Sequence, residues 1–538
     1  MTPPVAEVSA APDTTPLAMP AHVPPPPEPI CFRGKQAYLI GIGGCGMSGI
    51  ARLLASHGAS VRGSDIAPSE ITAALERDGL SVAFDQSSGQ LPEGCDLLVA
   101  SAAVKPDHPQ LIEATRRGLP ILSYAEALGQ CMLVRTGIAV AGTHGKSTTT
   151  AMLGAALADA GMEPSVIVGA TSGQLARGSL AEPATPIGHR VGSDTVPHGP
   201  LAGRPGFLVA ESCEFNRSFH HYRPLIASIS SVEADHLDVF GSLDEVVRAF
   251  HEFAMLIPPA QEGGRLLIAH DGAHRREVTA GLRCSVQTIG FSPQADWVIE
   301  ADAPARAVTL SHGRERVAAW TMTLPGTHNA INAATALALG TMAGADPAIL
   351  ARSLAAFTGI DRRMQFLGTR PIGPAGHGRG SVRVFDDYGH HPTEIDVTLR
   401  ALRESERPED RSARLICVFQ PHQHSRTRHL LDEFAAAFSQ ADVVIVPPIY
   451  FVRDSQEEKL KITAADLVDR LRRRGTRAMH LHPFEAIVEQ LENLCGDGDV
   501  LVVMGAGDVW KVARMFLETD DPHRHPGATT TKSPASPD

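Results

Sequence analysis

Residues 140–150 have the sequence VAGTHGKSTTT, and the predicted fold and function of the chain depend most on this stretch. An apolar run at 138–141 precedes it, and apolar residues at helical spacing follow it between 152 and 160. Glycines in such a loop let backbone N–H groups close around phosphate oxygens at a helix N-terminus, where the helix dipole favours anions. Lys146 would reach the outer phosphates, and the Ser147 hydroxyl is suited to ligate Mg²⁺. The strand-to-helix context therefore predicts a phosphate-binding loop.

The length and composition of the chain limit its class. At 538 residues it is too long for one hydrophobic core, and domains of ordinary size suggest three. A net charge of −12 offers no basic face, so we expect no nucleic-acid partner. The eight cysteines are scattered without a C-x-x-C pair, which indicates reduced thiols rather than disulfides or a zinc site.

Targeting signals are not evident in the sequence. Residues 1–30 are rich in proline, without a basic start or an apolar stretch, and read as a disordered leader rather than a signal peptide. No apolar run approaches the roughly 18 residues that a membrane helix needs. We therefore expect a cytoplasmic protein without a membrane partner.

The first ordered segment predicts a Rossmann-like nucleotide site. A strand at 37–40 runs into GIGGCG at 41–46 and then into a helical pattern, which is the G-x-G-x-x-G arrangement in its strand-turn-helix context. The next strand ends at an acidic residue suited to a ribose hydroxyl. The glycines only require a diphosphate close to the backbone, so a dinucleotide and a nucleotide-sugar diphosphate fit equally well. The predicted substrate-binding residues are Gly41, Gly43, Gly44, Gly46, Asp65 and Ser101.

Two later strands should deliver metal ligands to the phosphate loop. The apolar runs 206–210 and 225–229 lead to Glu211 and, a few residues on, to His236. Residues past the carboxyl ends of parallel strands converge on one crevice, so we expect both side chains to meet the Mg²⁺ at Ser147. Carboxylate oxygen suits Mg²⁺ better than imidazole does.

A helix that begins near residue 327 carries two asparagines. Asn329 and Asn332 lie three residues apart and share a face, and side-chain amides are suited to read an adenine edge. By contrast, residues 173–206 are rich in Gly, Pro, Ser and His without periodicity. They read as a long surface loop, to which we assign no chemistry.

The last third of the chain predicts one more α/β unit. A strand at 382–385 leads into DDYGHHPTE at 386–394, and a strand at 415–419 leads into QPHQHSRTR at 420–428. Two strand exits crowded with His, Asp and Arg indicate a polyanionic substrate.

The predicted fold class is α/β in three domains: a Rossmann-like N-terminal domain, a central P-loop ATPase domain with a mostly parallel sheet, and a Rossmann-like C-terminal domain. The predicted boundaries are a disordered leader at 1–30, the Rossmann-like N-terminal domain at 31–133, the central P-loop domain at 134–360, the C-terminal domain at 361–518 and a disordered tail at 519–538.

Taken in order, these motifs resemble the Mur ligases of peptidoglycan synthesis. The phosphate loop is followed by Glu211, by EADH at 233–236, by HNAINA at 328–333 and by DDYGHHPTE. The resemblance covers about residues 35–517. Together with GIGGCGMSGIA at 41–51, the third-domain motif looks most like the member that adds L-alanine.

The resemblance implies a reaction and its partners. ATP would phosphorylate the carboxylate of UDP-N-acetylmuramate, and the amine of L-alanine would attack the acyl phosphate to give an amide, ADP and phosphate. The N-terminal domain would hold the UDP-sugar, the central domain ATP and Mg²⁺, and the C-terminal domain the amino acid.

The resemblance also implies residue roles. Ser147, Glu211 and His236 would serve the metal, and Lys146, His390 and Arg426 the reacting phosphoryl group. With the phosphate loop, the ATP-binding set is Gly142, Thr143, His144, Gly145, Lys146, Ser147, Thr148, Asn329, Asn332, Arg362 and Arg363. ESCEFN at 211–216 stands where the family usually has EADESD, so the number of metals stays open. Gln423 stands where members often have arginine, leaving Arg426 to supply the charge.

Other functions stay open. A recycling ligase would join a ready-made tripeptide to the same sugar nucleotide. An NAD-dependent oxidoreductase would use the 41–46 loop with Asp65 on the ribose, but it leaves the phosphate loop unexplained. A nucleotide-gated binding protein would do no chemistry. L-alanine is favoured over serine or glycine only by the resemblance, and the sequence does not predict an oligomeric state.

Overall fold

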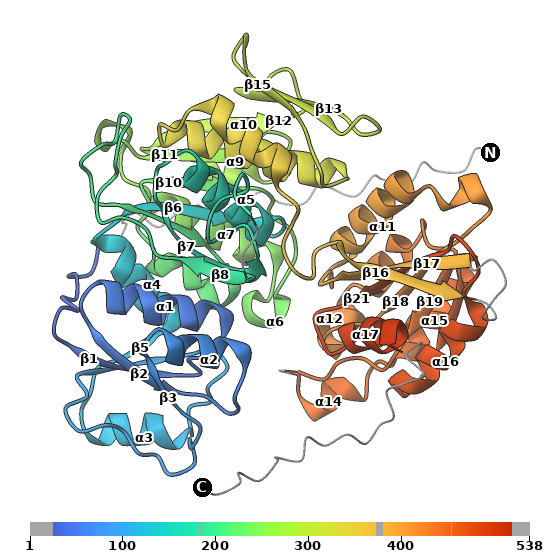
Figure 1. Ribbon diagram of the computed structural model, residues 1–538, viewed down its shortest axis with the longest axis horizontal. Coiled ribbons are helices and arrows are strands. Elements are labelled where there is room, and N and C mark those ends of the chain that lie inside the picture. The colour runs from blue at the N-terminus through green and yellow to red at the C-terminus, as the bar shows by residue number, and fades with distance from the viewer. Residues whose placement is uncertain (1–24, 183–184, 373–379, 453, 519–538) are drawn as a thin grey trace, which may run out of the picture.

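The computed structural model describes residues 25–182, 185–372, 380–452 and 454–518. Most of the predicted leader, residues 1–24, and the whole predicted tail, 519–538, lie outside the described residues. Within the described residues the strands form three sheets, one for each third of the chain (Figure 1). The predicted fold class, three α/β units with mostly parallel sheets, is confirmed.

The N-terminal sheet is parallel, with the order β3-β2-β1-β4-β5. Because the order reverses between β1 and β4, a crevice opens at the carboxyl ends of these strands. Helix α3 packs on one face of this sheet, and α1, α2 and α4 pack on the other. The elements are β1 Gln36–Ile40, α1 Cys45–Ser56, β2 Ser60–Ser64, α2 Glu70–Arg77, β3 Ser81–Ala83, β4 Leu97–Ala100, α3 Pro109–Arg116, β5 Ile121–Ser123 and α4 Tyr124–Leu133.

The central sheet has the order β15-β14-β13-β12-β11-β10-β6-β9-β7-β8. It is parallel from β7 through β13 and antiparallel at both ends, where β8 pairs with β7 and where β13, β14 and β15 form a meander. Its strands are β6 Thr136–Ala141, β7 Ser165–Ser172, β8 Ile187–Arg190, β9 Phe207–Glu211, β10 Ile226–Ile229, β11 Arg265–Ala269, β12 Ser285–Gly290, β13 Trp297–Asp302, β14 Ala307–His312 and β15 Glu315–Thr321. Its helices are α5 Lys146–Asp159, α6 Leu237–Phe240, α7 Leu243–Met255, α8 Arg275–Thr279, α9 Thr327–Met342 and α10 Pro347–Ala356.

The strand β8 lies inside the segment that the sequence predicts as a surface loop. It pairs antiparallel with β7, and its His189 is buried against Gly49 of α1. The prediction is wrong for these four residues, because a strand this short carries too few alternations to show a period.

The C-terminal sheet has the order β16-β17-β21-β18-β19-β20, parallel except for β16 at its edge. Alternate residues of β18 face opposite cores, one under α11, α13 and α15 and the other under α16 and α17. The elements are β16 Gln365–Ile372, β17 Gly380–Asp387, α11 Pro392–Glu406, β18 Leu415–Phe419, α12 His424–His429, α13 Leu431–Ala437, β19 Val443–Val446, α14 Gln456–Lys459, α15 Ala464–Arg473, β20 Arg477–His480, α16 Phe484–Leu494, β21 Val500–Met504 and α17 Trp510–Glu518.

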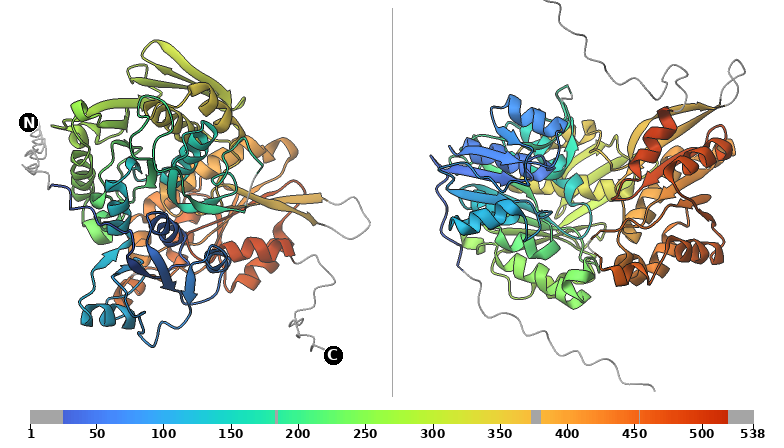
Figure 2. Two further views of the ribbon diagram at one scale, coloured as in Figure 1. Left: turned by 60° about the vertical axis from the view of Figure 1, so that its left-hand side comes forward. Right: turned by 90° about the horizontal axis from the view of Figure 1, so that it is seen from below.

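One hydrophobic core joins the first two domains. Leu39 of β1 and Leu54 of α1 belong to the same buried cluster as Ala139 of β6, Ala227 of β10 and Phe250 of α7. Buried clusters of the C-terminal sheet, in contrast, contain only C-terminal residues. The right-hand view of Figure 2 shows this division, with the C-terminal domain as a separate body beside the other two. Among the described residues, no helix has the length and apolar character needed to cross a membrane.

Candidate active site

The loop between β6 and α5 has the geometry that a phosphate loop needs. Gly142 has φ +125° and Gly145 has φ +81°, values that L side chains rarely adopt. A Cβ on Gly142 would lie 2.1 Å from Ser230 Oγ, and one on Gly145 would lie 2.4 Å from Asn332 Oδ1. Both positions therefore require glycine, and the loop directs its backbone toward the N-terminus of α5.

Lys146 is held beneath this loop by a carboxylate. Its ammonium donates to the carbonyl oxygens of Gly142 at 2.6 Å and Thr143 at 3.0 Å, and to Glu214 Oε2 at 2.9 Å. Burial alone would lower the pKa of Lys146, but the Glu214 carboxylate raises it above its ordinary value. Lys146 is therefore a cation at neutral pH.

Ser147 and Glu211 converge as the sequence predicts. Ser147 Oγ donates to Glu211 Oε1 at 2.7 Å, and Glu211 Oε2 accepts the Gly169 N–H at 2.6 Å. Two hard oxygen donors at the first turn of α5 are suited to Mg²⁺, so the residues fit the predicted metal.

His236 belongs to a neighbouring cluster. Its nitrogen and carboxylate oxygens of Glu214 and Asp235 lie within 4.8 Å of one another. Burial lowers the pKa of His236 and so favours the neutral ring, the form that ligates metals. His236 thus clusters with Glu214, the partner of Lys146, while Ser147 pairs with Glu211, and His236, Ser147 and Glu211 line one cleft.

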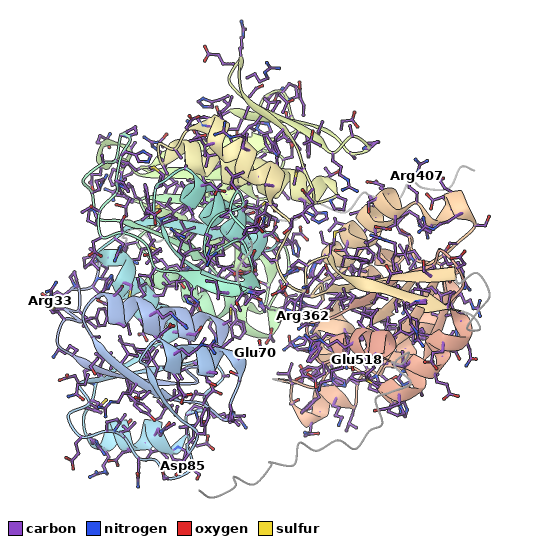
Figure 3. The ribbon with its side chains drawn as sticks, viewed as in Figure 1. Arg33, Glu70, Asp85, Arg362, Arg407 and Glu518 are labelled. Carbon is purple, nitrogen blue, oxygen red and sulfur yellow. The ribbon has the colours of Figure 1, made fainter. Side chains whose placement is uncertain are left out.

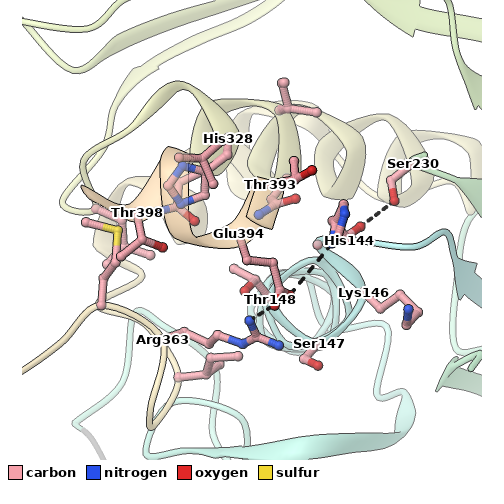
Figure 4. A pocket seen from close by; sticks show the side chains of 18 of the residues that line it. His144, Lys146, Ser147, Thr148, Ser230, His328, Arg363, Thr393, Glu394 and Thr398 are labelled. Atoms are coloured by element: carbon pink, nitrogen blue, oxygen red, sulfur yellow. Dashed lines mark hydrogen bonds and ion pairs between the residues drawn. The ribbon is translucent and has the colours of Figure 1, made fainter. Parts of the chain in front are cut away.

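A pocket of about 220 Å³ lies between the phosphate loop, α9 and the start of α11 (Figure 4). Of the predicted ATP set, it is lined by His144, Gly145, Lys146, Ser147, Thr148, Asn329, Asn332 and Arg363. Asn329 Nδ2 donates to Pro325 O at 2.8 Å, and Asn332 Oδ1 accepts from Thr149 Oγ1 at 3.3 Å. Both amides are therefore fixed by the protein, and His328, which the sequence reasoning passed over, lines the same pocket.

Gly142, Thr143 and Arg362 are the members of the predicted ATP set that do not line this pocket. Arg362 lies where the central and C-terminal domains meet (Figure 3). It donates to Gly505 O at 2.7 Å, contacts Asp386 at 3.4 Å and lies over the Tyr388 ring. These contacts are all with residues of the C-terminal domain, and Arg362 lines the larger cleft described below, whereas its neighbour Arg363 lines both this pocket and that cleft.

A larger cleft of about 470 Å³ receives side chains from all three domains. It is lined by Cys45, Lys146, Ser147, Glu211, His236, Arg362, Arg363, Tyr388, His390, His422, Gln423 and Arg426, among others. It therefore brings the predicted metal ligands to the three residues predicted to act on the phosphoryl group. Burial lowers the pKa of His390 to about 4, so its ring is neutral.

Arg426 is paired across the domain boundary. Its guanidinium donates to Asp235 Oδ1 at 2.6 Å and approaches His236 Nδ1 at 3.4 Å. The side chain is only 7% exposed. A cation thus lies in the cleft where the sequence reasoning expects one, and it is held there by a carboxylate of the central domain.

The predicted diphosphate loop lies at the start of α1. Gly43 N donates to Asp65 Oδ2 at 2.7 Å, and Ile66 N donates to Asp65 Oδ1 at 2.8 Å. Asp65 therefore supports the glycine turn, and its contact with a ribose hydroxyl stays a prediction. Gly41 has φ +76° and packs beside Ser101 at the exit of β4.

Three models of one family match the chain in succession. The catalytic domain of the Mur ligase family matches residues 36–136, the Mur ligase middle domain residues 140–340, and the Mur ligase glutamate ligase domain residues 362–507. The chain belongs to the Mur ligase family.

Two relatives and one crystal structure match this chain over most of its length. A UDP-N-acetylmuramate–L-alanine ligase of Acetivibrio thermocellus is 34% identical, over 90% of this chain and 96% of the relative. A protein of the same name from Chlorobium luteolum is 35% identical, over 89% of this chain and 95% of the relative. The crystal structure of the UDP-N-acetylmuramate–alanine ligase of Thermotoga maritima shares the fold, with a TM-score of 0.67 and 24% identity, over 90% of this chain and 98% of that one.

Four acidic residues of this Mur ligase escaped the site prediction although they line or support the cleft: Glu214, Glu233, Asp235 and Glu394. All four stand within the polar runs that follow strands, which is the signal that selected Glu211. Their roles could not be predicted from the spacing of residues in the sequence, because each carboxylate pairs with a cation from a different loop.

Proposed function

We propose that this Mur ligase forms an amide between the carboxylate of UDP-N-acetylmuramate and L-alanine, with ATP and Mg²⁺, in the cytoplasm. The observation that carries the proposal is the three-domain cleft. Lys146 and Ser147 line it from the central domain, and His390 and Arg426 line it from the C-terminal domain. The names of the two relatives support the choice of both substrates.

Each wall of the cleft has a part in this reaction. ATP, when bound, would supply the phosphoryl group that converts the muramoyl carboxylate into an acyl phosphate. Ser147 and Glu211 would hold Mg²⁺, and Lys146 would neutralise charge on the phosphates. The neutral ring of His390 would orient the substrate, and Arg426 would face the acyl phosphate as the amine attacks and phosphate leaves.

The recycling ligase is the second candidate. It uses the same sugar nucleotide and the same chemistry, so the phosphate loop and metal ligands do not discriminate between the two. The amino-acid side of the cleft does, because a tripeptide needs room that a single alanine does not. The names of the two relatives favour alanine.

Phosphate release from the purified protein tests the proposal. The assay would contain ATP, Mg²⁺ and UDP-N-acetylmuramate, with L-alanine, L-serine, glycine or the tripeptide added in turn. We expect fastest release with L-alanine and none without the UDP-sugar. Release that requires the tripeptide would establish the recycling ligase, and release that requires no acceptor would reduce the protein to an ATPase.

A further inference from the structure

His144 of the phosphate loop lies between two carboxylates that come from different domains. Its Nε2 is 3.3 Å from Glu233 Oε2, in the central-domain loop after β10. Its Nδ1 is 3.7 Å from Glu394 Oε1, in the first turn of α11 of the C-terminal domain. Figure 4 shows the ring of His144 directed at Glu394, beside Thr393 and Arg363.

The backbone of the phosphate loop fixes this ring in place. His144 N donates to Ser231 Oγ at 3.1 Å, and its carbonyl oxygen accepts from Ser230 Oγ at 2.5 Å. Glu233 is tied to the same loop, because its N–H donates to Thr143 Oγ1 at 2.9 Å. The central-domain half of the contact is therefore formed by the phosphate loop and by the loop after β10 that is hydrogen-bonded to it.

The C-terminal half is equally well anchored. Glu394 accepts from Arg363 Nη1 at 3.1 Å and from the His390 N–H at 3.0 Å. Thr393 of the C-terminal domain also contacts the central domain, because its hydroxyl donates to Glu233 Oε2 at 2.8 Å. Residues 390–394 thus include His390, which lines the cleft, as well as Thr393 and Glu394, which contact Glu233 and His144.

Charge makes the contact strong. Burial alone would lower the pKa of His144, but the hydrogen bond to Glu233 and the nearby carboxylate of Glu394, 3.7 Å from Nδ1, raise it to about 9. The hydrogen bond from His144 lowers the pKa of Glu233 to about 2. At neutral pH a cation therefore bridges two anions, and hydrogen bonds between charged groups are roughly twice as strong as neutral ones.

We propose that His144 is a positioning residue, which docks the start of α11 on the phosphate loop and so fixes His390 opposite the phosphates. His144 also lines the pocket predicted for ATP, but its ring pairs with Glu233 and Glu394, whereas Lys146 and Ser147 pair with Glu214 and Glu211. The docking rests on geometry alone, whereas its effect on turnover also rests on the proposed function.

A metal ion is the competing occupant. Ligand atoms of His144, Glu233 and His391 lie within 4.8 Å of one another, and His391 Nε2 is buried without a hydrogen-bond partner in the described structure. However, His391 Nδ1 accepts the Thr393 N–H at 3.3 Å. The neutral ring then carries its proton on Nε2 and has no lone pair there to offer a metal. Stoichiometric Zn²⁺ binding by the wild type, lost in His391→Ala, would overturn the proposal.

Kinetics of three variants test the pairing. We expect His144→Gln and Glu394→Gln each to lower kcat about tenfold, the value of one charge-assisted hydrogen bond. The double variant should be no slower than the slower single variant, because each residue acts through the other. Losses that multiply, or a change confined to the KM for ATP, would overturn the proposal. His274→Gln is the matched control, since His274 lies 3.6 Å from Glu277 on the remote helix α8.

Small-angle X-ray scattering tests the docking without substrates. Thr393→Val removes only the hydroxyl that meets Glu233 and leaves the phosphate loop intact. We expect a larger radius of gyration for Thr393→Val and His144→Gln than for the wild type and His274→Gln. An active wild type whose variants all scatter alike would overturn the docking, whereas an inactive wild type would overturn only the proposed function.

The docking should also depend on pH in a defined direction. The pKa of His144 is raised above the ordinary 6.5 to about 9. Its stabilisation is therefore complete below pH about 6.5 and is lost as the pH rises through about 9. The other ionisable groups that face it are Glu233, Glu394, Arg363, His390 and His391. The carboxylates and the guanidinium keep their charge through this range, and burial lowers the pKa of both histidines, so they stay neutral.

We expect the wild-type radius of gyration to rise above pH about 9, and the His144→Gln radius to stay constant over the same range. Parallel curves for the two proteins would overturn the assignment of this titration to His144.

Discussion

At the scale of single residues, the cations of the active site are paired with carboxylates from other loops. Lys146 meets Glu214 at 2.9 Å, and Arg426 meets Asp235 at 2.6 Å. Both carboxylates are buried, so removing a cation leaves a buried anion without compensation. Substitutions in this site therefore affect stability as well as catalysis, and the two effects must be separated by design.

Lys146→Met should abolish ligation while binding of the UDP-sugar survives, because the lysine belongs to the phosphate loop and the sugar nucleotide is predicted to bind the N-terminal domain. Isothermal titration calorimetry with UDP-N-acetylmuramate is the measurement, and loss of sugar binding would contradict the domain assignment. We also expect the unpaired Glu214 to cost about 3–5 kcal/mol of stability. The double variant Lys146→Met/Glu214→Gln should recover stability but not activity, which separates the two effects.

Arg426→Ala should lower kcat about a hundredfold, with little change in the KM values. A charge-assisted contact that strengthens in the transition state of a desolvated site is worth about 3 kcal/mol. Arg426→Lys should recover little, because a point charge cannot reproduce the guanidinium fork. Steady-state kinetics with each substrate varied is the measurement.

Two further variants show whether the loss of kcat in Arg426→Ala comes from the reaction or from the pairing with Asp235. Arg428→Ala, on the same helix but paired with Glu458 at the surface, should behave as wild type. If Asp235→Asn reproduces the Arg426→Ala loss in full, then Arg426 serves only to hold Asp235. A rise confined to the KM for the UDP-sugar or the amino acid would instead make Arg426 a binder of the ground state.

At the scale of elements, the glycine turn before α1 is the predicted binding site of the UDP-sugar. A Cβ on Gly43 would lie 2.8 Å from both Asp65 Oδ2 and Thr72 Cγ2. Gly43→Val should therefore displace the turn and raise the KM for the UDP-sugar, with little change in the KM for ATP. Gly272→Ala is a suitable control, because a Cβ there meets only ordinary contacts. Equal rises in both KM values would indicate general misfolding. Tight NADH binding by the wild type would instead support a dinucleotide site at residues 41–46.

The sequence predicted the elements that have a strong local pattern. Buried parallel strands such as β9, β10 and β18 are largely apolar runs, and the structure contains all three. The short edge strand β8 was missed because its four residues show too weak a pattern to be recognised as a strand. The domain boundaries and the roles of the site residues stay predictions.

The site was predictable where function depends on position after a strand. Ser147 and Glu211 meet because parallel strands end at one edge of the sheet. The sequence predicted a ribose contact for Asp65 but not its hydrogen bond from Gly43 N, because nothing in the sequence shows that the carboxylate folds back on the glycine turn. Glu214 and Glu394 were passed over for the same reason, since a pairing between loops is decided by the tertiary fold.

At the scale of the whole molecule, the division of the core predicts two unfolding steps. The N-terminal and central domains share one buried cluster, and the C-terminal domain is built on its own. We expect calorimetry to show two heat-absorption peaks, with the C-terminal domain unfolding independently of the other two. One peak that matches the van't Hoff enthalpy of the full chain would contradict this.

The shared core has a consequence for how this enzyme can be divided. A cut between Ile360 and Asp361 severs one peptide segment and leaves every buried cluster of the described residues with all its members on one side. The two fragments, made separately, should each fold and should reconstitute a ligase whose activity depends on fragment concentration. A cut near Val134 should yield no such pair, because it divides a hydrophobic interior that neither piece can complete alone.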